Sequence, residues 1–214
     1  IFYKLKYKNN NSISGLVLIN SDWPFFYRNQ CGPYFESVRR NFFDQINFID
    51  KVKNNFTNIL IKNPSYSFDL YQKNNLKFDI INRENIYKIK RQSSFVTNYP
   101  WEKSVNNSHF PICSYIGTTF LILMANDVPN LLFSRYSDFN FNDKFSKYMK
   151  EYKKFNFYHY HPNKAADYLI KNKEDLNKIW NEKKFKDFRE EFRYEFCNIK
   201  NNWQYDFAKK IIEN

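Results

Sequence analysis

The sequence predicts an α/β protein with a Rossmann-like, doubly wound parallel sheet followed by a helical extension. Two patterns predict this class. Short apolar runs bounded by turn residues alternate with segments of helical periodicity, and the residues after about 160 carry helical periodicity alone. The 214 residues, 43% of them hydrophobic, suffice to bury a core. We expect a polar lead-in or linker over 1–14, a sheet domain over 15–160, and helices packed on it over 161–214.

Continuous apolar runs predict the strands, because a parallel strand that is covered on both faces carries apolar side chains at nearly every position. Proline, glycine and asparagine at the ends of these runs predict where the strands stop. The expected strands are GLVLIN at 15–20, NILIK at 58–62, FDII at 78–81, FPIC at 110–113, NLLF at 130–133, and the pair Phe157-Tyr158.

Apolar residues at three- and four-residue steps predict the helices. The first follows Pro33, and later ones cover about 118–126 and about 143–154. Pro162 suits the first position of a helix that starts near Asn163. The tail carries two apolar stripes, one formed by Phe185, Phe188, Phe192 and Phe196 and the other by Trp203, Phe207 and Ile211.

Glycine content excludes several nucleotide-binding motifs. The three glycines, Gly15, Gly32 and Gly117, are far apart, whereas a P-loop, a kinase glycine loop and the GxGxxG turn each need clustered glycines. A phosphate would therefore have to be held by a helix N-terminus, hydroxyl groups and basic side chains. Three dispersed cysteines argue against a disulfide framework or zinc ribbon and favour a reducing cytoplasm.

The net charge of +12 suits an acidic ligand, an anionic membrane face or nucleic acid. A basic nucleic-acid-binding module is therefore an alternative function. Against it, the basic residues are scattered and carry no RNP-like, zinc-finger or helix-turn-helix signature. A second alternative is a Rossmann-like domain that keeps its fold and serves as a non-catalytic interaction partner.

Ligands of an open α/β sheet bind at the carboxyl ends of its strands, and the strongest candidate there is the segment CSYIGTTF at 113–120. Gly117 permits a tight turn after the strand, Tyr115 lies within that turn, and Thr118 and Thr119 open a helix. Unpaired N–H groups and two hydroxyls at such a point would bind an anion. The alternative is that Thr118 or Ser114 merely caps the helix.

Three further residues stand at or beyond strand ends. Lys62 precedes a proline at the end of a strand, and Arg28, in the loop after the first strand, could clamp a diphosphate. His159 ends the last strand and could donate to a phosphate or a sugar. Each has a simpler alternative, such as a solvated lysine beside a turn. His159 and His161 lack a Cys or carboxylate that would complete a metal set, so no metal site is predicted. No catalytic triad or carboxylate pair is visible, and the catalytic residues stay unassigned.

The segment FPICSYIGTTFLILMANDVPNLLF at 110–133 resembles the strand–TTFL–helix–NIP–strand block of a group of transferases. These are encoded in bacterial O-antigen and other surface-polysaccharide clusters. A Y…H-x-x-P-x-x-A-A pattern that starts at Tyr148 continues the resemblance into the helical tail, and Tyr27-Arg28 with Gly32-Pro33 resembles the group's YR…GP segment. The match covers about residues 15–210.

The resemblance implies the C-terminal half of a GT-B glycosyltransferase, the half that grips the nucleotide-sugar. Arg28, Lys62, Thr118 and Thr119 would then face the donor's phosphates. The nucleotide-sugar is a substrate, so no cofactor is implied, and the sugar would pass to a glycan or lipid-linked acceptor. The other implied partner is an N-terminal Rossmann-like half, which commonly supplies the catalytic base. We expect a cytoplasmic location with peripheral contact to the inner membrane, and no nucleic acid partner.

Two places depart from the group's pattern. Ile122 follows TTFL where the group has a glutamate, and Phe139-Asn140-Phe141-Asn142 stands where the group has W-E-L-R, so that Asn142 replaces the arginine. These differences favour the non-catalytic alternative.

Overall fold

The computed structural model of the chain describes residues 5, 7, 13, 15–19, 35–56, 58–62, 105 and 109–197. The strand expected at 78–81 and the stripe that begins at Trp203 lie outside these residues.

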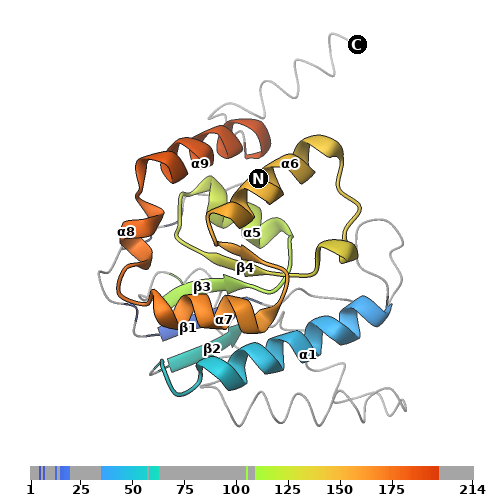
Figure 1. The fold of residues 1–214 in the computed structure, drawn as a ribbon, viewed down its shortest axis with the longest axis vertical. Helices are drawn as coiled ribbons and strands as arrows, with labels where there is room; N and C mark the ends of the chain where they lie inside the picture. The colour runs from blue at the N-terminus through green and yellow to red at the C-terminus, as the bar shows by residue number, and fades with distance from the viewer. Residues whose placement is uncertain are drawn as a thin grey trace.

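In the described residues, five parallel strands form one sheet in the order β2-β1-β3-β4-β5 (Figure 1). They are β1 (Gly15–Ile19), β2 (Asn58–Lys62), β3 (His109–Cys113), β4 (Leu131–Phe133) and β5 (Tyr158–His159). Every residue of β1 is buried, as its unbroken apolar run predicts. The predicted α/β class and Rossmann-like sheet are confirmed, and β5 begins one residue later than the expected pair.

Helices cover both faces of this sheet (Figure 1). They are α1 (Phe35–Val52), α5 (Thr118–Ala125), α6 (Asp143–Lys154), α7 (Pro162–Lys171), α8 (Leu176–Trp180) and α9 (Lys183–Phe196), with a 3₁₀ turn η1 (Tyr136–Asp138). α1 packs beside α7, and Phe48 of α1 stacks on Phe133 of β4 with ring centroids 4.9 Å apart. On the other face Phe120 of α5 contacts Tyr152 of α6 and Phe192 of α9. α1 and α7 therefore cover one face of the sheet, and α5, α6 and α9 cover the other, as in a doubly wound sheet.

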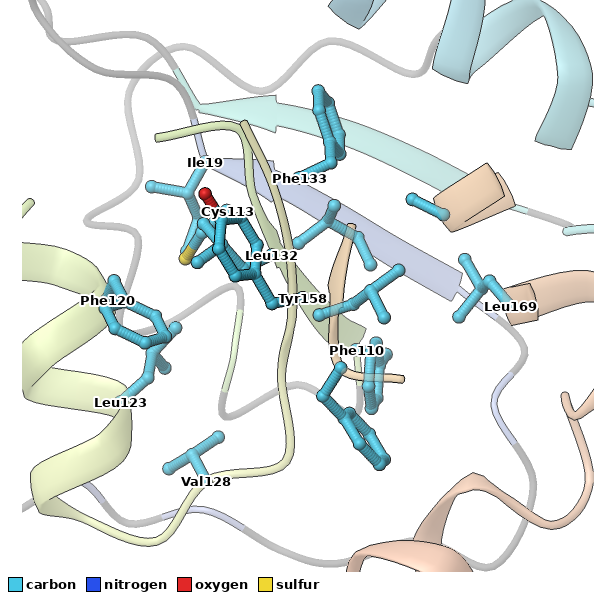
Figure 2. Close-up of a cluster of buried hydrophobic side chains, with 14 of the residues drawn as sticks. Ile19, Phe110, Cys113, Phe120, Leu123, Val128, Leu132, Phe133, Tyr158 and Leu169 are labelled. Atoms are coloured by element: carbon cyan, nitrogen blue, oxygen red, sulfur yellow. The ribbon is translucent and has the colours of Figure 1, made fainter. Parts of the chain in front are cut away.

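The core fills the space between these layers. Figure 2 shows Phe120 and Leu123 of α5 on one side of the central strands and Leu169 of α7 on the other. Two residues of the expected lead-in also belong to this core. Leu5 and Ile13 are buried, and the Leu5 N–H donates to Asn126 Oδ1 at 2.8 Å.

The C-terminal helices are anchored by a buried arginine. Arg189 is 1% exposed and lies over the rings of Trp180 and Phe185, 4.2 and 4.7 Å from their centroids. Its Nε donates to Asp127 Oδ1 at 2.8 Å, and its Nη1 donates to the carbonyl of Trp180. A buried charge needs such partners, and here they join α8 and α9 to the turn that follows α5.

None of the helices in the described part of the chain is both long enough and apolar enough to cross a membrane.

Candidate functional site

The parallel strands end along one edge of the sheet, here called the carboxyl rim. The register pairs Ile19 with Lys62 on one side and with Cys113 on the other, so β1, β2 and β3 end at the same level. From β1 the chain continues to β2 in one direction, whereas β3, β4 and β5 follow in the other. Ligands of doubly wound sheets bind outside the strand ends where the order reverses, which in this sheet is between β1 and β3.

The turn between β3 and α5, residues 114–117, lies at that reversal. Ser114 is buried, and both its N–H and its Oγ donate to the carbonyl oxygen of Ile19 at 3.3 Å. The turn is therefore fastened to the end of the neighbouring strand. The hydroxyl of Ser114 faces that carbonyl rather than the helix.

In the part of the chain that the structure describes, no side chain accepts a hydrogen bond from the N–H groups of the first turn of α5. Gly117 occupies the N-cap position in an extended conformation, and the N–H groups of Thr118, Thr119 and Phe120 donate to no side chain among the described residues. The alternative in which Ser114 or Thr118 caps the helix is therefore wrong. No acidic residue occupies this first turn, and Thr118 is exposed while Thr119 is half-buried. This helix start has the partial positive charge and the open donors that attract an anion.

Gly117 also makes room for an aromatic ring. A Cβ atom at this position would lie 3.0 Å from Cε1 of Tyr115, closer than carbon atoms normally pack. The Tyr115 ring therefore lies against the backbone at the start of the helix.

α1 supports the same turn from the side. Asn41 Nδ2 donates to the carbonyl oxygen of Ser114 at 2.6 Å, and Gln45 Nε2 donates to Asn41 Oδ1 at 2.5 Å. No pattern in the sequence indicates this brace, because Asn41 and Ser114 are distant in the chain and asparagine is common in it.

Arg135, two residues beyond β4, is a rim residue that the sequence analysis missed. Its Nε and Nη2 donate to the two carboxylate oxygens of Asp44 at 3.1 and 3.0 Å. This hydrogen bonding raises the pKa of Arg135. Arg40 pairs with Asp138 at 3.1 Å, so two ion pairs join the loop after β4 to α1. The available signal was an arginine two residues after the apolar run NLLF.

Half-buried aromatic rings continue along the rim from the turn toward β5. The ring centroids of Tyr115 and Phe139 are 5.1 Å apart, and Phe139 stacks on Phe141 at 5.1 Å. Tyr136 continues the row, 5.5 Å from Phe141 and 5.7 Å from Tyr160. This aromatic row fills the stretch of rim between the turn and the last strand.

His159 lies at the other end of the row. It lines a hollow of about 460 Å³ between the end of α6 and the start of α7, and no residue of 114–119 lines that hollow. Its Nε2 lies 2.8 Å from the carbonyl oxygen of Asn156. Burial lowers the pKa of His159, the hydrogen bond to Asn156 opposes this, and the charge of Lys153 adds to the lowering. Neutral imidazole is therefore the favoured form near pH 7.

The structure thus brings together some of the binding residues that the sequence predicts. Tyr115, Gly117, Thr118 and Thr119 share one turn, and the backbone of Lys62 ends on the same rim. Arg28 lies outside the described residues.

The described residues hold no group of three potential metal ligands. Burial raises the pKa of the Cys113 thiol, which disfavours a thiolate at the end of β3. Ile122, at the position where the resemblance places a glutamate, is buried in the core. A buried carboxylate at this position would need a hydrogen-bond or ion-pair partner, whereas the apolar side chain of Ile122 needs none.

A family model described as "LIC12162 family transferase" matches residues 1–211. Comparison with curated proteins and with solved structures finds no match.

Proposed function

Because the chain belongs to the LIC12162 family of transferases, we propose that it is a glycosyltransferase that takes its sugar from a nucleotide-sugar. In this proposal the start of α5 receives the donor's phosphates. The acceptor is a surface-polysaccharide glycan or a lipid-linked precursor of one.

One observation carries the proposal: the uncapped start of α5 lies where the strand order reverses. The N–H groups of Thr118, Thr119 and Phe120 belong to a helix start that no described side chain caps, at the position where doubly wound sheets bind their ligands. The hydroxyls of the two threonines add donors beside these amides. Contacts from Ile19 and Asn41 hold the turn in place before any ligand arrives.

Such a site favours the chemistry of sugar transfer. When the bond between sugar and phosphate breaks, negative charge builds up on the leaving nucleotide, and fixed amide dipoles stabilise that charge without reorganising. Lys62, at the end of β2, and Arg28, in the sequence between β1 and α1, are proposed to supply positive charge on the same rim. Tyr115 packs against Gly117 and shapes the wall of the site.

The remaining parts of the proposal follow the family resemblance. The chain would act as the donor-binding half of a GT-B enzyme at the cytoplasmic side of the inner membrane, together with a second Rossmann-like half that supplies the catalytic base. His159, also expected to face the donor, lines the separate hollow, which is considered below.

Thermal unfolding in the presence of UDP-, CMP- and GDP-linked sugars tests the proposal. We expect at least one of them to raise Tm, because a ligand at about 100 times its Kd stabilises the folded state by about 2.7 kcal/mol. The double variant Thr118→Val, Thr119→Val should lose this rise, since valine keeps the side-chain shape and removes both hydroxyls.

Tyr194→Phe is the matched control, because it removes an exposed hydroxyl from α9 and should keep the full rise in Tm. The absence of a shift with all three nucleotide classes would reject the donor-binding function. A shift that persists in the double valine variant would reject the start of α5 as the phosphate site.

A further inference from the structure

The hollow beside β5 has the size and charge of a second ligand site. It lies between the last turn of α6, the strand β5 and the first turn of α7, and its volume of about 460 Å³ falls in the usual range for small-molecule sites. The family resemblance assigns no role to it as a site of its own.

Two lysines that line the hollow carry uncompensated charge. Lys153 and Lys164 form no ion pair or hydrogen bond with any residue that the structure describes, and no carboxylate lines the hollow. The nearest acids along the helices are taken by other lysines. Glu151 pairs with Lys154 at 2.6 Å, and Asp167 pairs with Lys51 at 2.5 Å.

Histidines and aromatic rings complete the wall. Lys153 Nζ lies 3.8 Å from the ring centroid of Tyr160, and the rings of His159 and Tyr168 are 5.4 Å apart. Neutral His159 donates Nε2–H to the Asn156 carbonyl, which leaves Nδ1 able to accept a hydrogen bond from a hydroxyl. His161 is the exposed N-cap residue of α7 and makes no side-chain cap bond.

These features suit a ligand that has both an anionic group and a hydroxyl-bearing body. Two ammonium groups favour phosphate, a histidine acceptor favours a hydroxyl, and tyrosine rings favour the flat face of a small ring. A purely apolar ligand would leave both lysines without a partner.

We propose that the hollow lined by Lys153, His159, Tyr160, His161, Lys164 and Tyr168 binds a phosphate monoester carried on a small hydroxylated group. The phosphate lies between the two lysines and the hydroxylated group packs on the tyrosine rings. This site is separate from the start of α5 and does not depend on the donor-binding function.

Isothermal titration of the full chain with glucose 1-phosphate and with inorganic phosphate tests the site. The double variant Lys153→Gln, Lys164→Gln should bind glucose 1-phosphate at least about tenfold more weakly, since it loses two charge-assisted contacts. The matched control Lys150→Gln, Lys178→Gln removes the same charge from exposed positions outside the hollow and should bind like the parent chain. The Thr118→Val, Thr119→Val variant should also bind glucose 1-phosphate normally, which separates this site from the proposed donor site.

A second arm identifies the source of the phosphate. Sedimentation with phosphatidylcholine vesicles, with and without phosphatidic acid, asks whether a lipid headgroup competes for the two lysines. Lysine-dependent binding to glucose 1-phosphate supports the site, whereas binding to phosphatidic acid alone overturns the proposal, because phosphatidic acid carries no free hydroxyl group. The proposal is overturned if neither binds, if both lysine pairs weaken binding equally, or if only the threonine variant loses it.

Discussion

Two helices begin at the same edge of the sheet, and their starts differ. α6 follows β4, and its first turn is completed by its own sequence: Asn142 Oδ1 accepts from the N–H of Phe145 at 2.9 Å, and Asp143 adds a negative charge. α5 follows β3, has Gly117 as its N-cap residue, and has neither a capping side chain from the described residues nor an acid in its first turn. Two neighbouring strand–helix connections therefore leave opposite charge at the rim.

This difference indicates which helix start can bind an anion. An N-cap side chain stabilises a helix by about 1 kcal/mol. An uncapped helix lacks this stabilisation, and a bound ligand that accepts hydrogen bonds from its first N–H groups can supply it. α7, whose N-cap residue is His161, also has no side-chain cap bond and no acid in its first turn, and its Lys164 lines the hollow. In each case where a described helix follows a rim strand without a cap, a candidate anion site lies beside it.

The largest expected effect comes from giving α5 the kind of start that α6 has. Gly117→Asp places a carboxylate that caps the helix and repels a phosphate, so the proposed nucleotide-sugar should bind at least about tenfold more weakly, which corresponds to about 1.4 kcal/mol. Titration calorimetry with the nucleotide-sugar that gives the largest Tm rise measures the change.

Two variants separate charge from shape in that experiment. Gly117→Ala adds only a Cβ, which meets the Tyr115 ring at 3.0 Å, and should weaken binding less than aspartate does. Asn142→Asp adds the same charge at the capped helix and should leave binding unchanged. Equal loss in all three variants would remove the distinction between the two helix starts.

A smaller effect is expected from removing the cap of α6. Asn142→Ala should lower the free energy of unfolding by about 1 kcal/mol, or Tm by about 2–4 °C, because the N–H of Phe145 loses its acceptor. Chemical denaturation measures the first value and thermal unfolding the second. Nucleotide binding should not change, and a loss of binding would show that both helix starts serve the ligand.

The smallest effect concerns pH and the last strand. Burial lowers the pKa of His159, so the unfolded chain takes up a proton at higher pH than the folded chain does. The free energy of unfolding should therefore fall as pH drops from 7 toward 5, and His159→Gln should make this fall less steep. Urea denaturation at several pH values measures the slope, with His161→Gln at an exposed position as the control. An unchanged slope in His159→Gln would contradict the attribution of this pH dependence to His159.

Local patterns predicted most of the described fold. The apolar runs expected at 15–20, 58–62 and 110–113 correspond to β1, β2 and β3. The helix expected over about 143–154 has those bounds, since Asn142, Asp143 and the lysines at its end are strong boundary signals. The stripe that includes Phe185, Phe188 and Phe192 is buried as its spacing predicts.

These local patterns could not predict contacts between residues that are distant in the chain. The pairing of Arg135 with Asp44 and the brace from Asn41 to Ser114 join segments whose separation in the chain hides their proximity. The hollow beside β5 likewise depends on the meeting of α6 and α7, which no single segment encodes. Leu5 and Ile13 are buried although the residues around them are mostly polar, because isolated apolar residues carry no periodicity.

Arg189 sets a limit on how the chain can be divided. Its guanidinium donates to Asp127 and to the carbonyl of Trp180, and it packs on the Trp180 ring. Cutting the chain between α8 and α9 would therefore leave Asp127 without its ion-pair partner and would expose one face of the Trp180 ring. Transferring the sheet and α5 into another protein would therefore have to include α9 as well.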